Sequence, residues 1–110
     1  MAQSNNDDDM LNRHVSWMVP ADVAILQYLT HSRTVNGNPS IQTPKTIAVN
    51  TGYSRKHASN RAQVLADHGL VEKVSHGEYR LSDLGERAIK HEVPYEELED
   101  VDESEDENSD

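Results

Sequence analysis

Apolar residues recur at helical spacing in the first half of the chain, beginning in the segment 17–31. Ile25, Leu26 and Leu29 fall on one stripe of a helix with about 3.6 residues per turn. Pro20 lies in the expected first turn, where the missing backbone N–H is harmless. The pattern therefore predicts a first helix.

A run of turn-forming residues follows, and it predicts a loop that leads into a very short strand at residues 40–42. Thr43 is typical of a helix N-cap, and Pro44 is typical of the first helical position. The helix that they begin ends near Gly52, because glycine can adopt the left-handed conformation that closes a helix. We therefore expect a second helix of about two turns.

The third predicted helix begins after Ser54, another residue that caps helix N-termini. Ala58, Ala62 and Leu65 recur at i, i+4 and i+7, so they share the face that turns inward. Gly69 ends the helix. Because the two inward alanines are small, this helix is expected to pack either close to its neighbours or somewhat loosely.

The periodicity then changes from helical to alternating, as in β-strands. Residues 70–75 and 78–82 form the two predicted strands of a hairpin, and Gly77 lies in the turn, where positive φ is needed. Ser82 is the expected N-cap of a last helix, although Gly85 weakens the helical pattern there. This order of elements predicts an α+β fold, a winged helix-turn-helix that is mainly helical with a small antiparallel β-hairpin wing.

The two ends of the chain differ in composition from its middle. Residues 1–13 are polar and acidic, and residues 94–110 are too charged and too poor in apolar residues to offset the entropy of ordering. We predict a disordered acidic N-terminus over 1–13, a winged helix domain over 14–93 and a disordered acidic tail over 94–110.

Composition argues against several other classes of protein. The chain contains no cysteine, so neither a disulfide framework nor a thiolate metal site is available. No apolar stretch approaches the roughly 20 residues that span a bilayer, and the N-terminal residues lack the basic and apolar regions of a signal peptide. We expect a soluble, cytoplasmic protein that does not associate with a membrane.

A net charge of −10 at first argues against nucleic acid as a partner, but the distribution of charge argues for it. All ten basic residues lie within residues 13–93 together with seven acids, which leaves that region at +3, and the other thirteen acids lie at the ends of the chain. Residues 41–66 contain four basic residues and no acid. Positive potential is therefore concentrated around the second and third predicted helices.

Several short sequence fragments, arranged in a particular order across residues 17–92, resemble those of a known family. They are Trp17-Met18, Thr43-Pro44 with Ile47-Ala48, Gly52-Tyr53-Ser54, Gly69-Leu70-Val71, Gly77-Glu78-Tyr79 and Leu81-Ser82-Asp83-Leu84-Gly85. In their order and spacing the chain is similar to the winged helix-turn-helix transcriptional regulators of halophilic archaea, including those like the repressor of phage phi-H. The resemblance implies a repressor-like regulator that binds double-stranded DNA, in a halophilic host.

In this fold the third helix enters the major groove, which displays a distinct pattern of donors and acceptors for each base pair. With Ala58 taken as the inward direction, Lys56, Asn60 and Gln63 point outward, and we expect them to contact base edges. Ser59 lies at the flank of this face. Lysine suits the acceptors of guanine, and Asn or Gln can pair with adenine.

The remaining predicted DNA contacts surround this face. Residues near helix N-termini are suited to phosphates, and they are Lys45, Ser54 and Arg55. Arg61 flanks the core, from which it could reach either a phosphate or a neighbouring acid. On the wing, the candidates for contacts with the DNA backbone or minor groove are Lys73, His76 and Arg80.

Each assignment has a plainer alternative. The polar side chains of the third helix could be only solvated, and His76 could be only a turn residue. Arg80 could pair across the strands with Glu72 or Glu78. The competing function is a winged helix that binds a protein partner without binding DNA. We favour DNA because the outer face of the third helix shows no large apolar patch.

We expect no catalysis, no cofactor and no metal site. The six histidines show no ligand spacing such as HExxH, and no P-loop, GxGxxG or GxSxG sequence occurs. No small-molecule ligand is evident. We expect a homodimer, because a two-fold protein reads a palindromic site with doubled contacts. Its interface is left open between residues 10–17, the first helix, and the last helix with Val93 and Tyr95.

Overall fold

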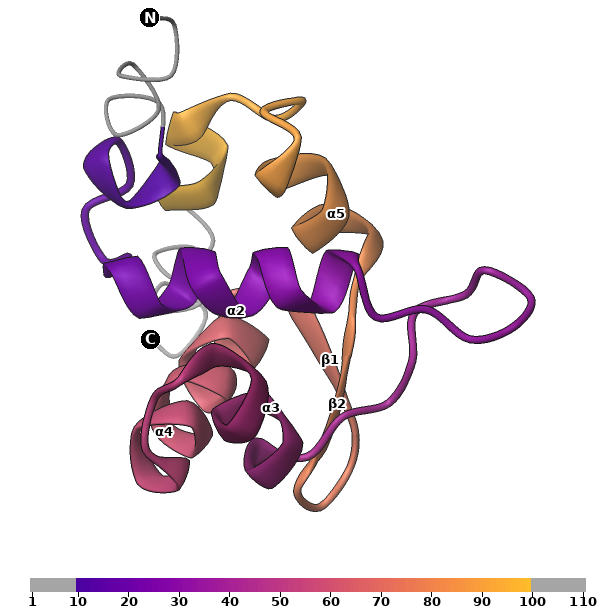
Figure 1. Cartoon of the computed structure of the whole chain (residues 1–110). Coiled ribbons are helices and arrows are strands. Elements are labelled where there is room, and N and C mark those ends of the chain that lie inside the picture. The colour runs from indigo at the N-terminus through magenta and orange to yellow at the C-terminus, as the bar shows by residue number, and fades with distance from the viewer. Residues whose placement is uncertain (1–9, 100–110) are drawn as a thin grey trace, which may run out of the picture.

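Helices and strands follow one another in the order that the sequence predicts. The structure is a computed structural model that describes residues 10–99 (Figure 1). Its elements are the 3-10 helix η2 (Leu11–Arg13), α2 (Pro20–Thr30), α3 (Pro44–Thr51), α4 (Arg55–Asp67), β1 (Val71–Ser75), β2 (Glu78–Leu81) and α5 (Asp83–Ile89). Residues 95–99 are also helical. The predicted α+β winged helix-turn-helix fold is confirmed.

Helix α2 is the central element of the domain. It runs across the middle of the molecule, with α3 and α4 packed on one side and α5 on the other (Figure 1). Ile25 and Leu26 of α2 and Leu65 of α4 are each 0% exposed, and Ala58 and Ala62 are buried beside them. The inward faces predicted for the first and third helices are therefore confirmed.

The helices begin and end where their capping residues predict. The Thr43 hydroxyl accepts the Thr46 N–H at 3.3 Å, and the Ser54 hydroxyl accepts the His57 N–H at 3.0 Å. Gly52 closes α3 with a φ of 86°, in the left-handed region. These local signals fix the short connection between α3 and α4.

The wing is an antiparallel pair of strands with Val71 opposite Leu81 and Lys73 opposite Tyr79. The strand predicted at residues 40–42 is reduced to one bridge, in which Gln42 and Tyr79 exchange backbone hydrogen bonds of 2.7 and 2.9 Å. It extends no further, because the next residue already caps α3.

The folded region is wider than the sequence predicts. Leu11 and Leu98 are each 1% exposed, so the prediction of disorder is wrong for residues 10–13 and 94–99. The indole N–H of Trp17 donates to the Leu98 carbonyl at 3.1 Å, and the Ser16 N–H and hydroxyl both donate to the Glu99 carboxylate at 2.7 Å. Each end alone is too polar to order, but the two ends pack against one another. Residues 1–9 and 100–110 of the predicted disordered ends lie outside the described residues.

Gly85, which weakens the sequence pattern of the last helix, is needed for its packing. The Ser82 hydroxyl caps α5 by accepting the Gly85 N–H at 3.0 Å. A Cβ atom on Gly85 would lie 2.0 Å from the Leu70 carbonyl oxygen, far inside van der Waals contact. Helix α5 can therefore approach the start of β1 only with a glycine at this position.

We expect Gly85→Ala to lower the free energy of unfolding by about 1–3 kcal/mol or more, since the contact is with backbone that cannot move aside. Helix propensity alone predicts a gain of about 1 kcal/mol from the same change. Urea unfolding checks the sign, with the exposed Glu92→Ala as a control that should change stability by less than about 0.5 kcal/mol. A more stable Gly85→Ala variant contradicts the packing argument.

Candidate nucleic-acid interface

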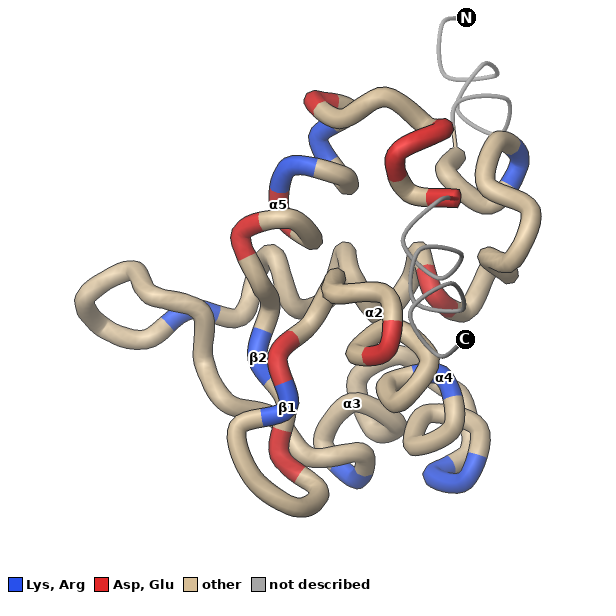
Figure 2. The backbone as a smooth tube through the Cα atoms, turned by 180° about the vertical axis from the view of Figure 1, so that it is seen from behind, with Lys and Arg blue, Asp and Glu red and all other residues tan. Residues whose placement is uncertain are grey.

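A groove of about 770 Å³ lies between the start of α3, the first half of α4 and the turn of the wing. We call it the α3–α4 groove, and its lining residues are Thr43, Pro44, Lys45, Arg55, Lys56, Ser59, Asn60 and Gly77. Figure 2 shows the basic positions at the starts of α3 and α4 at the same end of the molecule as the hairpin turn. The structure thus brings five predicted DNA-binding residues together: Lys45, Arg55, Lys56, Ser59 and Asn60.

Two helix N-termini contribute to this groove. Lys45 lies in the first turn of α3, and Arg55 and Lys56 are the first two residues of α4. The N-terminal turns of helices present unpaired backbone N–H groups and the positive end of the helix dipole, which favour anions. Ser54 occupies the predicted N-cap of α4, where its hydroxyl is engaged by the His57 N–H.

Among residues 10–99, the cations of the α3–α4 groove differ from the other basic residues in having no partner. Within residues 10–99, Lys45, Arg55 and Lys56 make no ion pair or side-chain hydrogen bond, and all three are exposed. The other Lys and Arg residues each interact with another group, and they are Arg13, Arg33, Arg61, Lys73, Arg80, Arg87 and Lys90. In the part of the chain that the structure describes, unneutralised positive charge is therefore concentrated at this groove.

Arg61 turns away from the groove and into an ion pair with Asp22 of α2. Its Nε and Nη2 atoms donate to the two carboxylate oxygens at 2.8 and 2.7 Å, and Nη2 also lies 3.4 Å from the Trp17 carbonyl oxygen. The hydrogen bond from Asp22 raises the pKa of Arg61 above its ordinary value. Of the two partners that the sequence leaves open for Arg61, a phosphate or a neighbouring acid, the structure shows the acid.

Gln63 and Lys73, both predicted DNA contacts, are bonded to one another. The Gln63 amide oxygen accepts from the Lys73 ammonium at 3.2 Å and from the Tyr79 hydroxyl at 3.4 Å. Its amide nitrogen donates to the Asp67 carboxylate at 3.0 Å. The half-buried side chain of Gln63 therefore faces the wing, between α4 and the hairpin.

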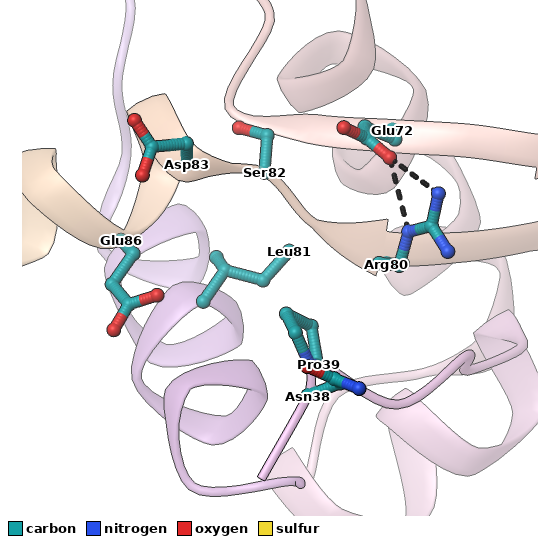
Figure 3. A pocket seen from close by; sticks show the side chains of 8 residues that line it. All are labelled: Asn38, Pro39, Glu72, Arg80, Leu81, Ser82, Asp83 and Glu86. Atoms are coloured by element: carbon teal, nitrogen blue, oxygen red, sulfur yellow. Dashed lines mark hydrogen bonds and ion pairs between the residues drawn. The ribbon is translucent and has the colours of Figure 1, made fainter. Parts of the chain in front are cut away.

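Arg80 pairs across the strands with Glu72, through bonds of 3.0 and 2.8 Å to one carboxylate oxygen. Figure 3 shows this pair at the edge of a further hollow of about 430 Å³, which shares no lining residue with the α3–α4 groove. Three carboxylates, those of Glu72, Asp83 and Glu86, line that hollow. His76 remains exposed in the turn of the wing.

Three residues of the α3–α4 groove were not among the predicted contacts. Thr43, Pro44 and Gly77 line it, whereas the sequence indicates only that they start a helix or form a turn. The signal that could have identified them is the position of helix α3, whose N-terminus meets the wing in this fold.

Within residues 10–99, no group of three or more His, Cys, Asp or Glu side chains could hold a metal ion. In the same range, no helix is long and apolar enough to cross a membrane.

Comparison with known proteins gives two matches of the same kind. A family model described as winged helix-turn-helix phage repressor matches residues 11–101. The chain is also similar to the "Repressor protein" of Halobacterium phage phiH, with 38% identity over 92 residues, which cover 81% of this chain and 98% of that protein. No solved structure gives a significant match.

The two arginines of α4, Arg55 and Arg61, are expected to differ in their effect on stability. Arg61→Ala should lower the free energy of unfolding by about 3–5 kcal/mol, because it leaves the Asp22 carboxylate buried without its cation. Arg55→Ala should change it by less than about 0.5 kcal/mol, because Arg55 is exposed and has no partner within residues 10–99. Denaturant unfolding of both variants checks the difference, and equal effects contradict it.

Proposed function

The chain belongs to the winged helix-turn-helix phage repressor family, and from that membership we propose that it is a repressor-like transcription regulator that binds double-stranded DNA in a sequence-specific manner. One observation supports a particular surface of this molecule as the one that binds DNA. The three basic side chains without a partner in residues 10–99 all line the α3–α4 groove. A surface of this kind fits the phosphate backbone, which supplies most of the affinity of proteins for DNA.

In the proposed complex, α4 lies in the major groove and reads base edges. Lys56 and Asn60 are exposed on the α4 side of the groove, and Ser59 lies beside them, half-exposed. Lysine can donate to the O6 and N7 acceptors of guanine, and asparagine can pair with the N6 and N7 atoms of adenine. These residue types support a specific reading of sequence, beyond attraction to phosphates.

Phosphate contacts would hold α4 in place. Lys45 and Arg55 lie in the first turns of α3 and α4, where backbone N–H groups add to their charge. His76 lies in the exposed turn of the wing, beside Gly77 of the groove, and would face the flanking DNA backbone. The proposal gives no direct DNA contact to Arg61 or Arg80, because both are held by acids of the domain.

Binding of a partner protein is the competing function, and it requires an apolar surface on α4 or the wing. Within residues 10–99 the exposed large apolar residues are Val35, Ile41 and Val49, and none of them lines the α3–α4 groove. Polar and cationic lining favours DNA over a protein partner.

We further propose that the protein acts as a homodimer, because two copies related by a two-fold axis read a palindromic site with doubled contacts. Two valines of the terminal segments are used within one protomer, since Val15 is 1% exposed and Val93 is 6% exposed. Met10, Trp17 and Tyr95 are only partly buried and remain available for a dimer contact.

The first test is selection of genomic DNA fragments with the purified full chain at several potassium chloride concentrations, followed by gel shift of the enriched fragment. We expect a discrete palindromic site. Lys56→Ala combined with Asn60→Ala should weaken its binding by at least roughly tenfold, because each base contact contributes about 1–3 kcal/mol. Lys90→Ala is the matched control, since it also removes one positive charge but from a lysine paired with Glu86.

Circular dichroism of the double variant shows whether it keeps its fold. Loss of binding in a folded variant supports α4 as the reading helix. If the wild-type protein selects no fragment at any salt concentration while folded, the DNA proposal fails and the protein-binding function replaces it. Equal loss in Lys90→Ala indicates that only net charge matters, which contradicts sequence-specific reading.

Lys45→Ala should weaken binding about equally for all DNA sequences. It should also make the negative slope of log K against log salt concentration shallower by about one, as expected when one phosphate contact is lost. Titrations of specific and unrelated fragments over a range of salt concentrations measure both effects. An unchanged slope contradicts the assignment of Lys45 to a phosphate.

A further inference from the structure

Tyr79 of β2 is tied to both helices that line the α3–α4 groove. Its backbone exchanges two hydrogen bonds with Gln42, which immediately precedes the N-cap of α3. Its hydroxyl donates to Gln63 of α4 at 3.4 Å. Tyr79 is 3% exposed, so little of this residue meets solvent.

Gln63 accepts hydrogen bonds from both strands of the wing. Its amide oxygen accepts from Lys73 of β1 and from Tyr79 of β2, which lie opposite each other in the hairpin. The bond from its amide nitrogen to Asp67 fixes which end of the amide faces the wing. Burial, together with the nearby charge of Asp67, raises the pKa of Tyr79, so the phenol remains protonated and can donate.

Val71, Tyr79 and Leu81 anchor the base of the wing in the core, whereas residues 75 and 76 near its turn are exposed. The sheet within residues 10–99 has two strands, and a two-stranded hairpin is marginal in isolation. The register shifts between Lys73 and Ser75, just before the turn. Gly77 of that turn lines the groove opposite α4, so a small rotation of the hairpin changes the width of the α3–α4 groove.

We propose that Gln63 is a positioning residue, which together with Lys73 and Tyr79 fixes the wing at a set distance from α4 and does not read a base. This inference rests on the proposed DNA-binding function. It replaces the interpretation of Gln63 from helical angles, which place it on the outer face of α4. The bonds to the hairpin turn the side chain toward the wing, whereas the outer positions of Lys56 and Asn60 stay open to DNA.

The test is a double-mutant cycle with Gln63→Ala and Tyr79→Phe. Tyr79→Phe removes one hydroxyl from a residue that is 3% exposed and that does not line the α3–α4 groove, so an effect on DNA binding acts through position. We expect each variant to weaken binding of the selected site by about two- to tenfold, the range for one neutral hydrogen bond, and the losses not to add. Hydroxyl-radical footprints should lose protection in the flanks under the wing, while base preference within the site is unchanged.

Thr34→Val is the control, because it also removes a hydroxyl, one that accepts the Asn38 N–H outside the wing, and it should bind DNA as the wild type does. A change of preference at one base pair in Gln63→Ala, with normal binding by Tyr79→Phe, overturns the proposal and makes Gln63 a reading residue. Additive losses also overturn it.

Amide hydrogen exchange of residues 71–81 in the free protein provides a readout without DNA. Gln63→Ala and Tyr79→Phe should both speed exchange in the hairpin, by about two- to tenfold, and leave α2 unchanged. Unchanged exchange in the hairpin overturns the positioning role. If the wild type selects no DNA, the proposed function fails, and hydrogen exchange then decides separately whether Gln63 holds the wing.

Discussion

The buried ion pair between Asp22 and Arg61 is the interaction on which the arrangement of the domain depends. A carboxylate that is 0% exposed needs a charged partner, since an unpaired buried ion is unfavourable by several kcal/mol. Asp22 also accepts the Val19 N–H at the start of α2. Helix α4 can therefore dock on α2 only with Arg61 turned toward it. This rotation leaves Lys56 and Asn60 on the side of α4 that faces the groove.

The far end of α4 is held by contacts between the two ends of the chain. The Trp17 ring stacks on His68 with centroids 3.7 Å apart and planes inclined by 6°. The same indole donates to the Leu98 carbonyl, so residues near each terminus close over the last turn of α4. Within residues 10–99, the first turn of α4 carries no such cover and opens into the α3–α4 groove. In this range, one end of the helix is anchored and the other is open to a ligand.

Local signals made most of the fold predictable, whereas contacts distant in sequence did not. The caps at Thr43 and Ser54 bond to residues three positions away, so sequence alone indicates them. Gly85 looks unfavourable by helix propensity, because the Leu70 carbonyl that excludes a side chain there becomes visible only in three dimensions. The sequence did not predict that residues 10–13 and 94–99 are ordered, because their contacts also link residues far apart in the chain. For the site, helical angles identified the outward residues of α4, but they could not show that Gln63 is bonded to the wing.

The positive character of the α3–α4 groove arises from where the acids are, rather than from an excess of basic residues. The chain has a net charge of −10, yet residues 41–66 contain no acid, and most cations elsewhere are paired within the domain. Such a surface does not attract DNA strongly at long range, and at about 1 M salt the screening length falls to about 3 Å. Recognition then depends on contacts made at hydrogen-bond distance. The precise placement of α4 and the wing, set by Asp22 on one side and Tyr79 on the other, matters more under those conditions than the total charge.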